Sequence, residues 1–287
     1  MLKNNFYKSI LLILIATLFG AIMIAIIKYV QNDINIHTTC FFRFFFGLLI
    51  IIPYHLITFL KYLKTNILHL HFLRSILNYP AMYFGFTAIF LIPLETNAAI
   101  TFSTPIFVSI IAILLFHEKI SKYRILSLFF GFVGILIVIR PGIIELEIGV
   151  VYSIASCIFW SLCVILTKKM VHFDSPLTII TYMYIFMTII TSIFAYYNWT
   201  LPDNMTLFLL FLGALCGTIF HLLTNHAYKI SELTFLMPFN YVNIIINSII
   251  GYFLFQDHPD LFTWIGAGLI VSSLSIGTYF DSKKNIN

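Results

Sequence analysis

Ten apolar stretches, each about 20 residues long and separated by short polar breaks, constrain the fold more than any other feature of this sequence. A helix needs roughly 20 apolar residues to cross the hydrocarbon core of a bilayer. The chain is 61% hydrophobic and 9% charged, whereas soluble domains carry about 25% charged residues. We therefore predict an all-α integral membrane protein with ten transmembrane helices. Their expected ranges are 9–27, 36–60, 72–92, 96–116, 124–140, 148–167, 176–197, 206–228, 233–255 and 261–280.

Prolines occur both between and inside these predicted helices. Pro53, Pro80, Pro105 and Pro238 lie inside them, where proline removes a backbone donor and frees a carbonyl that a neighbour must satisfy. We expect bends at these four positions. The first apolar stretch has no small-residue cleavage site before Gln31, so we expect it to be retained as a helix rather than removed as a signal peptide.

The distribution of Lys and Arg predicts the orientation, because basic loops are retained on the cytoplasmic side. With ten helices, 13 of the 16 basic residues fall on one side, two fall on the other, and Arg43 lies inside a helix. We expect a multi-pass protein of a bacterial inner membrane with both termini cytoplasmic. The basic residues are scattered, which favours the lipid bilayer as partner and no nucleic acid, and a homodimer is left open.

A weak internal repeat appears at an offset of 139 residues, at which Ala88 aligns with Ala227 and Leu94 with Leu233. The repeat divides the chain into two predicted five-helix units, 1–145 and 146–287. Since five is an odd number, the second unit is expected to be inverted relative to the first. Chance similarity between apolar helices is the alternative explanation.

Two stretches carry a family resemblance, 93–105 with Glu118 and 227–241 with Asp257. They resemble the two ends of the EamA-type repeat of the drug/metabolite transporter superfamily, and the pair Arg43-Phe44 resembles another feature of that family. The resemblance covers essentially the whole chain. The second copy departs from it by having aspartate at 257 and by placing Ile244 opposite Pro105.

The resemblance implies a secondary transporter, not an enzyme, with a central cavity that opens alternately to each side and needs no cofactor. Within the family the chain looks most similar to S-adenosylmethionine uptake carriers. This similarity implies a small-molecule cargo, S-adenosylmethionine, taken up by exchange with S-adenosylhomocysteine. Export of amino acids or drugs is the alternative.

Arg43 is the clearest candidate for substrate binding, because an ionisable residue inside a span is expensive and commonly functional. It lies about 10 Å from the start of its predicted helix at the α-helical rise. Its guanidinium is suited to a substrate carboxylate. The alternatives are that it snorkels toward the interface or pairs with Glu95.

Polar and aromatic side chains in several predicted helices are further candidates for lining a cavity. Asn240 begins a stripe with Asn243 and Asn247 on one helix face, which lines either the cavity or a helix contact. Aromatic rings attract cations and stack on bases, although many rings serve only lipid contact or packing. The remaining candidates are Tyr79, Tyr83, Thr101, Trp160, Asn225 and Tyr241.

Metal binding, catalysis and proton coupling are disfavoured by the pattern of ionisable residues. His221 and His226 are five residues apart, on different helix faces, with no third ligand evident. Every acidic residue falls in a predicted loop or at a helix end, whereas proton-driven carriers usually keep one within a span. We therefore expect an exchanger or a facilitator with no metal site and no catalytic residue.

Overall fold

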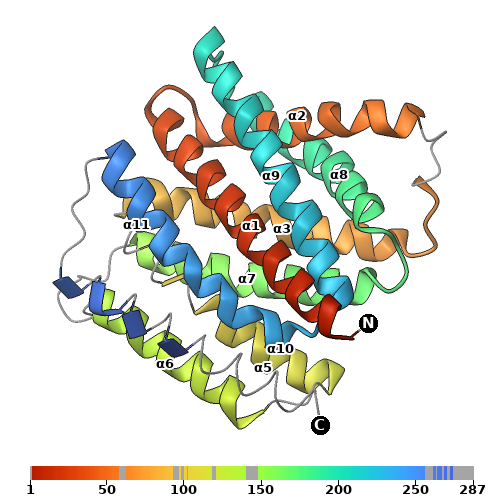
Figure 1. Cartoon of the computed structure of the whole chain (residues 1–287). Helices are drawn as coiled ribbons and strands as arrows, with labels where there is room; N and C mark the ends of the chain where they lie inside the picture. The colour runs from red at the N-terminus through yellow and green to blue at the C-terminus, as the bar shows by residue number, and fades with distance from the viewer. Residues whose placement is uncertain are drawn as a thin grey trace.

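The computed structural model describes residues 2–57, 63–92, 97, 100–101, 103–117, 121–139, 148–255, 261–262, 264–266, 268–269 and 272–273, and these residues are helical with short connections and no strand. Figure 1 shows the helices packed side by side in one bundle. The all-α prediction is confirmed for these residues. The elements are α1 (Leu2–Tyr29), η1 (Val30–Asn32), α2 (Ile36–Ile57), α3 (Leu68–Leu91), α5 (Thr104–Phe116), α6 (Lys122–Ile139), α7 (Ile148–Met170), α8 (Pro176–Tyr197), α9 (Asn204–Ile230), α10 (Leu233–Leu236), η3 (Met237–Tyr241) and α11 (Val242–Phe255).

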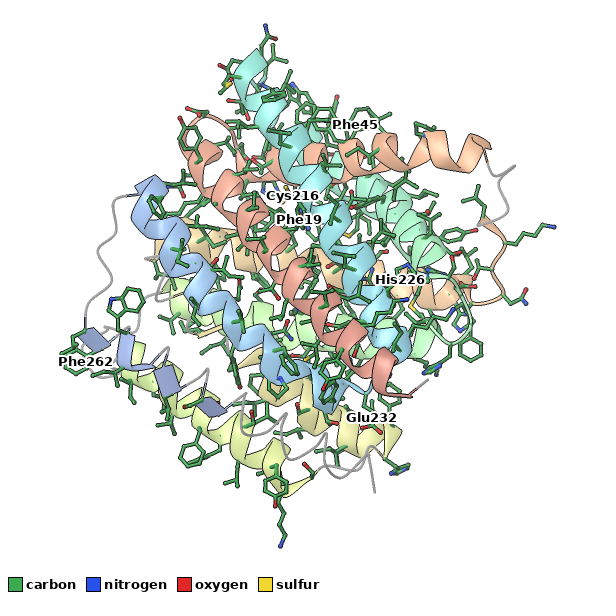
Figure 2. The ribbon with its side chains drawn as sticks, in the orientation of Figure 1. Phe19, Phe45, Cys216, His226, Glu232 and Phe262 are labelled. Carbon is green, nitrogen blue, oxygen red and sulfur yellow. The ribbon has the colours of Figure 1, made fainter. Side chains whose placement is uncertain are left out.

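Helices α1, α2, α7, α8 and α9 are long and apolar enough to cross a membrane by length and composition. The surface of the bundle carries many exposed apolar side chains, among them Phe253 of α11, which is 75% exposed, and Phe262 at the edge of the bundle (Figure 2). In water such a surface would be unfavourable, whereas lipid tails match it. The apolar exterior therefore fits a membrane-embedded protein.

Two of the predicted helices are interrupted. The predicted helix 96–116 resolves into helical residues at 97, 100 and 101, a turn at Ser103, and α5 from Thr104. The predicted helix 233–255 divides into α10, η3 and α11. Pro105 and Pro238 lie in the first turns of α5 and η3, where proline is tolerated because it has no N–H to leave unpaired. Helix interruptions thus coincide with these two prolines, and the bends expected there stay predictions.

Pro53 and Pro80 lie inside α2 and α3, which continue through them as single helices. α2 and α3 are therefore not interrupted at these prolines, and the bends expected there stay predictions. What distinguishes Pro105 and Pro238 is their position at the start of a new helix rather than within one.

Helices from the two halves of the sequence pack against one another. α1 runs along α9 and α3 runs along α7 (Figure 1), while α2 packs on α8. α5 contacts α7, and α11 contacts α1. The core is thus formed between the halves rather than within each of them. At one end of the bundle α1 and α3 begin, and α7 and α9 finish. We call this end the N-terminal end and the other one the opposite end.

Polar contacts join the two halves at both ends of the bundle. At the N-terminal end, His71 Nε2 lies 2.7 Å from Asp174 Oδ2, and Thr65 donates a hydrogen bond to the same oxygen. At the opposite end, the Thr38 hydroxyl donates to the backbone carbonyl of Asn198 at 3.3 Å. Each contact links a segment of the first half to a connection of the second.

Asp203 caps the N-terminus of α9, and its removal should destabilise the protein. Its Oδ1 accepts from the Thr206 N–H at 2.8 Å, and hydrogen bonds from Thr206 hold the pKa of Asp203 below its usual range. The contribution is therefore present above the ordinary aspartate pKa of about 4 and is lost as the pH falls through the lower folded value. Asp203→Ala should lower the thermal unfolding temperature of purified protein at pH 7, and Asp203→Ser, which keeps a capping oxygen, should restore most of it. Equal unfolding temperatures for all three proteins would contradict this role.

Candidate functional site

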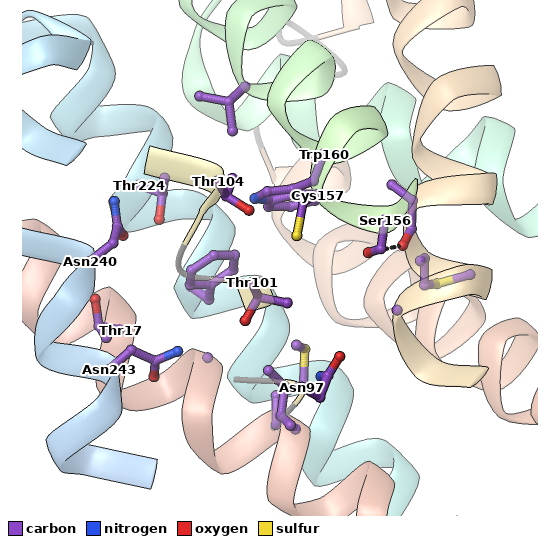
Figure 3. A pocket seen from close by; sticks show the side chains of 18 of the residues that line it. Thr17, Asn97, Thr101, Thr104, Ser156, Cys157, Trp160, Thr224, Asn240 and Asn243 are labelled. Atoms are coloured by element: carbon purple, nitrogen blue, oxygen red, sulfur yellow. Dashed lines mark hydrogen bonds between the residues drawn. The ribbon is translucent and has the colours of Figure 1, made fainter. Parts of the chain in front are cut away.

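A cavity of about 260 Å³ lies at the centre of the bundle. Its walls come from α1, α2, α3, α7, α9 and the two interrupted helices, the second of which includes α11. Figure 3 shows polar side chains pointing into it from different elements. The polar lining residues are Thr17, Arg43, Asn78, Asn97, Thr101, Thr104, Ser156, Thr224, Tyr228, Asn240, Asn243 and Asn247.

The two interrupted helices supply much of this polar lining. Asn97, Thr101 and Thr104 come from the first segment, and Asn240 and Asn243 from the second (Figure 3). Discontinuous helices commonly build the binding sites of transporters, because their free backbone groups and polar side chains meet the cargo inside the membrane. The Asn97 side-chain oxygen is already engaged, since it accepts a hydrogen bond of 2.8 Å from Ser153.

α7 forms a wall that combines an indole with small polar groups. Trp160 and Cys157 line the cavity, and the Ser156 hydroxyl donates 2.7 Å to the backbone carbonyl of Ala81 on α3 (Figure 3). Gly85 permits this close approach, because a Cβ built there would lie 2.8 Å from the Ser156 oxygen. The Trp160 ring lies 6.1 Å from the His221 ring on α9.

Arg43 reaches the cavity from α2 and is only 9% exposed. Its Nε lies 3.2 Å from the Met23 sulfur and its Nη1 3.6 Å from the Met82 sulfur, which are weak acceptors. Its Nη2 lies 3.5 Å from His221 Nε2. No ion-pair partner of Arg43 occurs among the described residues. Glu95, the alternative partner expected from the sequence, lies outside the described residues.

Burial argues against the snorkelling alternative for Arg43. A snorkelling side chain keeps its charged group in water, whereas this guanidinium is enclosed by Met23, Met82 and His221. A buried cation without a carboxylate is costly unless another anion completes the site. Among the described residues no carboxylate neutralises this cation, and the guanidinium lines the cavity.

The structure brings four of the eight candidate residues together around the cavity. They are Arg43, Thr101, Trp160 and Asn240. The other four are not among the lining residues. Asn225 is 1% exposed on α9 and its side-chain nitrogen has no hydrogen-bond partner. Tyr241 is fully buried, with its ring against Gly131 of α6.

Tyr79 and Tyr83 belong to an aromatic group on another face of α3. Tyr83 stacks on His37 with 5.2 Å between ring centroids, and Tyr79 stacks on Phe194 of α8 at 4.5 Å. Their rings thus hold α3 against α2 and α8 in this structure. Their assignment to the substrate cavity remains a prediction that this geometry does not support.

Sequence reasoning missed several lining residues. Thr17 and Asn78 are polar residues inside apolar helices, as Thr101 and Asn225 are, so the search for polar groups in the predicted helices could have selected them. Met23 and Met82 gave no such signal, because methionine is an ordinary filler of apolar cores. The lining residues that were missed include Thr17, Met23, Asn78, Met82, Asn97 and Tyr228.

Among the described residues, every acidic side chain lies outside the α-helices, as expected. Asp33 follows η1, Asp174 joins α7 to α8, and Asp203 and Glu232 precede α9 and α10. The cavity therefore offers amides, hydroxyls, one guanidinium and aromatic rings among these residues. Such groups can orient a polar organic molecule that carries a negative group.

Comparison with known proteins identifies the family. Residues 7–140 and 147–278 each match the EamA-like transporter family. The chain is 27% identical over 261 residues to the S-adenosylmethionine uptake transporter of Rickettsia prowazekii (strain Madrid E), covering 90% of this chain and 87% of the relative. It is 24% identical to the riboflavin transporter of Vibrio cholerae serotype O1 (strain ATCC 39315 / El Tor Inaba N16961), covering 99% and 97%.

The fold also matches a solved crystal structure with a TM-score of 0.74 and 14% sequence identity, over 92% of this chain and 98% of the other. The fold, the apolar helices and the two consecutive family matches agree with the resemblance drawn from the sequence motifs. This chain belongs to the EamA-like transporter family and is a multi-pass membrane transporter of a small molecule.

Proposed function

We propose that this transporter takes up S-adenosylmethionine by alternating access, in exchange for S-adenosylhomocysteine. The observation that carries the proposal is Arg43, a guanidinium that lines the cavity and has no ion-pair partner among the described residues. S-adenosylmethionine ends in an amino-acid carboxylate, whose two oxygens match the two parallel donors of a guanidinium. Relatives of this chain in four Rickettsia strains are named S-adenosylmethionine uptake transporters.

Arg43 also separates this cargo from its main rival. Riboflavin transporters are among the relatives, but riboflavin carries no carboxylate and no charge at neutral pH. Among the described residues, a buried guanidinium would then keep as neighbours the thioethers of Met23 and Met82, the His221 ring and the rings of Phe44 and Phe86. A carboxylate-bearing cargo satisfies Arg43 better, because charge-assisted hydrogen bonds are about twice as strong as neutral ones.

The rest of the cavity suits the nucleoside part of the cargo. Asn78, Asn240 and Asn243 offer amides, which both donate and accept hydrogen bonds as the edge of adenine requires. Trp160 offers an aromatic face for a base or for the sulfonium cation. The volume of about 260 Å³ is close to the lower bound of about 300 Å³ typical of small-ligand pockets.

Alternating access requires two halves that exchange roles, and helix bounds support two inverted five-helix repeats in a ten-helix protein. Shifted by the offset of 139 residues, α2 falls on 175–196, which is close to α8 (Pro176–Tyr197). In the same way α5 falls on 243–255, which is close to α11 (Val242–Phe255). Helix contacts follow the same exchange. The contact of α1 with α9 corresponds to the contact of α7 with α3, and the contact of α5 with α7 corresponds to the contact of α11 with α1. The repeat units 1–145 and 146–287 agree with the two family matches.

We further infer that the N-terminal end faces the cytoplasm. Lys8, Lys64, Lys168, Lys169 and Lys229 lie at or near helix ends there. Basic residues are enriched on the cytoplasmic side of bacterial inner-membrane proteins. The interrupted helices lie between the two ends, where an occluded cargo would be held.

Uptake of labelled S-adenosylmethionine into proteoliposomes containing the purified protein tests the proposal. Saturable uptake should rise several-fold when S-adenosylhomocysteine is preloaded inside, and a proton uncoupler should leave it unchanged. Collapse of uptake with the uncoupler would contradict an exchange mechanism. Matched liposomes without protein give the background.

The same vesicles distinguish the rival cargoes. Uptake of labelled riboflavin in place of S-adenosylmethionine would reject the proposed cargo and keep the transporter. Efflux of a preloaded amino acid or drug, with neither uptake activity, would favour the exporter alternative. Competition by unlabelled methionine, adenosine and riboflavin then shows which part of the cargo the cavity recognises.

A further inference from the structure

Arg74 is a second buried arginine that the proposed substrate site does not use. It lies on α3, is 3% exposed, and its Nε donates a hydrogen bond of 2.6 Å to the Thr167 hydroxyl on α7. Its Nη1 is buried and has no hydrogen-bond partner among the described residues. No ion-pair partner of Arg74 occurs in the described part of the chain. A buried guanidinium with an unused donor is expensive unless an anion reaches it in some state of the protein.

Arg74 lies near the cavity, on its side toward the N-terminal end of the bundle. Asn78, four residues later on α3, lines the cavity, and so does Val164, three residues before Thr167 on α7. Residues three or four apart occupy successive turns of one helix face. The pair of Arg74 and Thr167 is therefore one turn closer to the N-terminal end than the lining pair. Tyr228, which also lines the cavity, lies within electrostatic range of Arg74.

The two buried arginines occupy similar depths from opposite ends of the bundle. Arg43 is seven residues into α2, which starts at the opposite end, and Arg74 is six residues into α3, which starts at the N-terminal end. At 1.5 Å per residue each is about 10 Å from its own end. Tyr184 and His221 lie within electrostatic range of both guanidinium groups. The cavity thus has a buried cation toward each end.

We propose that Arg74 is a second carboxylate-binding station, which receives the carboxylate of the cargo from Arg43 when the transporter opens at its N-terminal end. The proposal rests on the proposed function, in which that end faces the cytoplasm and the cargo carries a carboxylate. In this structure Asn78, Val164 and Tyr228 line the cavity and Arg74 does not. Opening at the N-terminal end moves these side chains apart and exposes the unused Nη1 donor to the cargo.

A carboxylate handed between two guanidinium groups would avoid a step in which it is left without a partner. An unpaired carboxylate inside a membrane is unfavourable. Arg74 would bind cytoplasmic S-adenosylhomocysteine in the same way, because that molecule carries the same amino-acid carboxylate. The station therefore serves both directions of the exchange.

Sided transport measurements test the station. In vesicles of defined orientation, Arg74→Gln should raise the half-saturating concentration of S-adenosylhomocysteine at the N-terminal end by about tenfold or more. The half-saturating concentration of S-adenosylmethionine at the opposite end should change less than about threefold. Thr167→Val, which removes the hydrogen-bond partner of Arg74 without touching the guanidinium, controls for a purely structural role and should change neither value by more than about threefold.

A second measurement asks whether Arg74 acts through the carboxylate. Decarboxylated S-adenosylmethionine lacks that group and keeps the rest of the cargo. Arg74→Gln should weaken the wild-type preference for S-adenosylmethionine over its decarboxylated form at the N-terminal end. Equal losses for both compounds, or a Thr167→Val phenotype as large as that of Arg74→Gln, would overturn the proposal and leave Arg74 as a structural link between α3 and α7.

Ligand binding separates failure of the station from failure of the proposed function. If wild-type vesicles take up no S-adenosylmethionine, the proposed function fails. The station is then tested by thermal unfolding of the purified protein with S-adenosylhomocysteine and with L-methionine. Stabilisation of the wild type that is lost in Arg74→Gln supports the station, whereas no stabilisation by either carboxylate overturns it.

Discussion

Replacing Arg43 by glutamine is expected to lower S-adenosylmethionine uptake at subsaturating concentration by roughly ten- to hundredfold. The guanidinium is enclosed by Met23, Met82 and His221 and lines the cavity. Under the proposed function its strong partner is the cargo carboxylate, and a hydrogen bond to a charged group contributes about 1.5–3 kcal/mol. Glutamine keeps similar length and polarity but removes the charge and the paired donors.

Uptake by Arg43→Lys should fall between that of the wild type and that of Arg43→Gln, because lysine keeps the charge and loses the paired planar donors. Lys169→Gln is the matched control, since Lys169 is an exposed cation at the end of α7 and should transport as the wild type does. Initial rates in proteoliposomes, normalised to folded protein by size-exclusion chromatography, give the comparison. Normal uptake by folded Arg43→Gln would remove Arg43 from the site.

Enlarging Gly47 is expected to damage the fold more than any surface change. A Cβ built on Gly47 of α2 would lie 2.6 Å from Cζ of Tyr184 on α8. The Tyr184 ring is 2% exposed, and its hydroxyl lies 2.8 Å from the Thr218 hydroxyl on α9, so it has little room to move. Overpacking of this kind destabilises a protein by about 1–3 kcal/mol. Gly47→Ala should lower the unfolding temperature in detergent, and Gly47→Leu should yield no monodisperse protein.

Gly213→Ala is the matched control for this packing. A Cβ there would meet Ile26 at 3.4 Å, an ordinary van der Waals contact. The α9 helix should tolerate it, because alanine also favours helix over glycine. An unfolding temperature for Gly47→Ala equal to that of the wild type would show that α2 and α8 are not packed as described.

The sequence predicted the helices better than the site. Apolar runs of membrane length have few alternative structures, so the predicted ranges of α7 to α9 differ from the observed bounds by only a few residues. Helix interruptions coincide with Pro105 and Pro238, whereas α2 and α3 run through Pro53 and Pro80 without interruption. The difference depends on which neighbours meet each proline, and a local pattern does not contain that information.

Which face of a helix meets the cavity could not be read from the sequence. Tyr79 and Asn78 are adjacent on α3, yet Asn78 lines the cavity and Tyr79 stacks on Phe194. The two side chains point about 100° apart around the helix, and only the packing of α3 against α7 and α8 decides between them. Arg43 was predictable because a charge inside a membrane has few acceptable surroundings.

Packing between the halves has a consequence for the order in which the protein assembles. Arg43 meets His221, which follows it by 178 residues, and Arg74 meets Thr167, which follows it by 93. A chain is synthesised from its N-terminus, so α1, α2 and α3 reach the bilayer before α7 and α9 exist. During this interval the guanidinium groups of α2 and α3 lack the surfaces that later enclose them. Helices of the second half, α7 and α9, therefore complete the burial of side chains from the first.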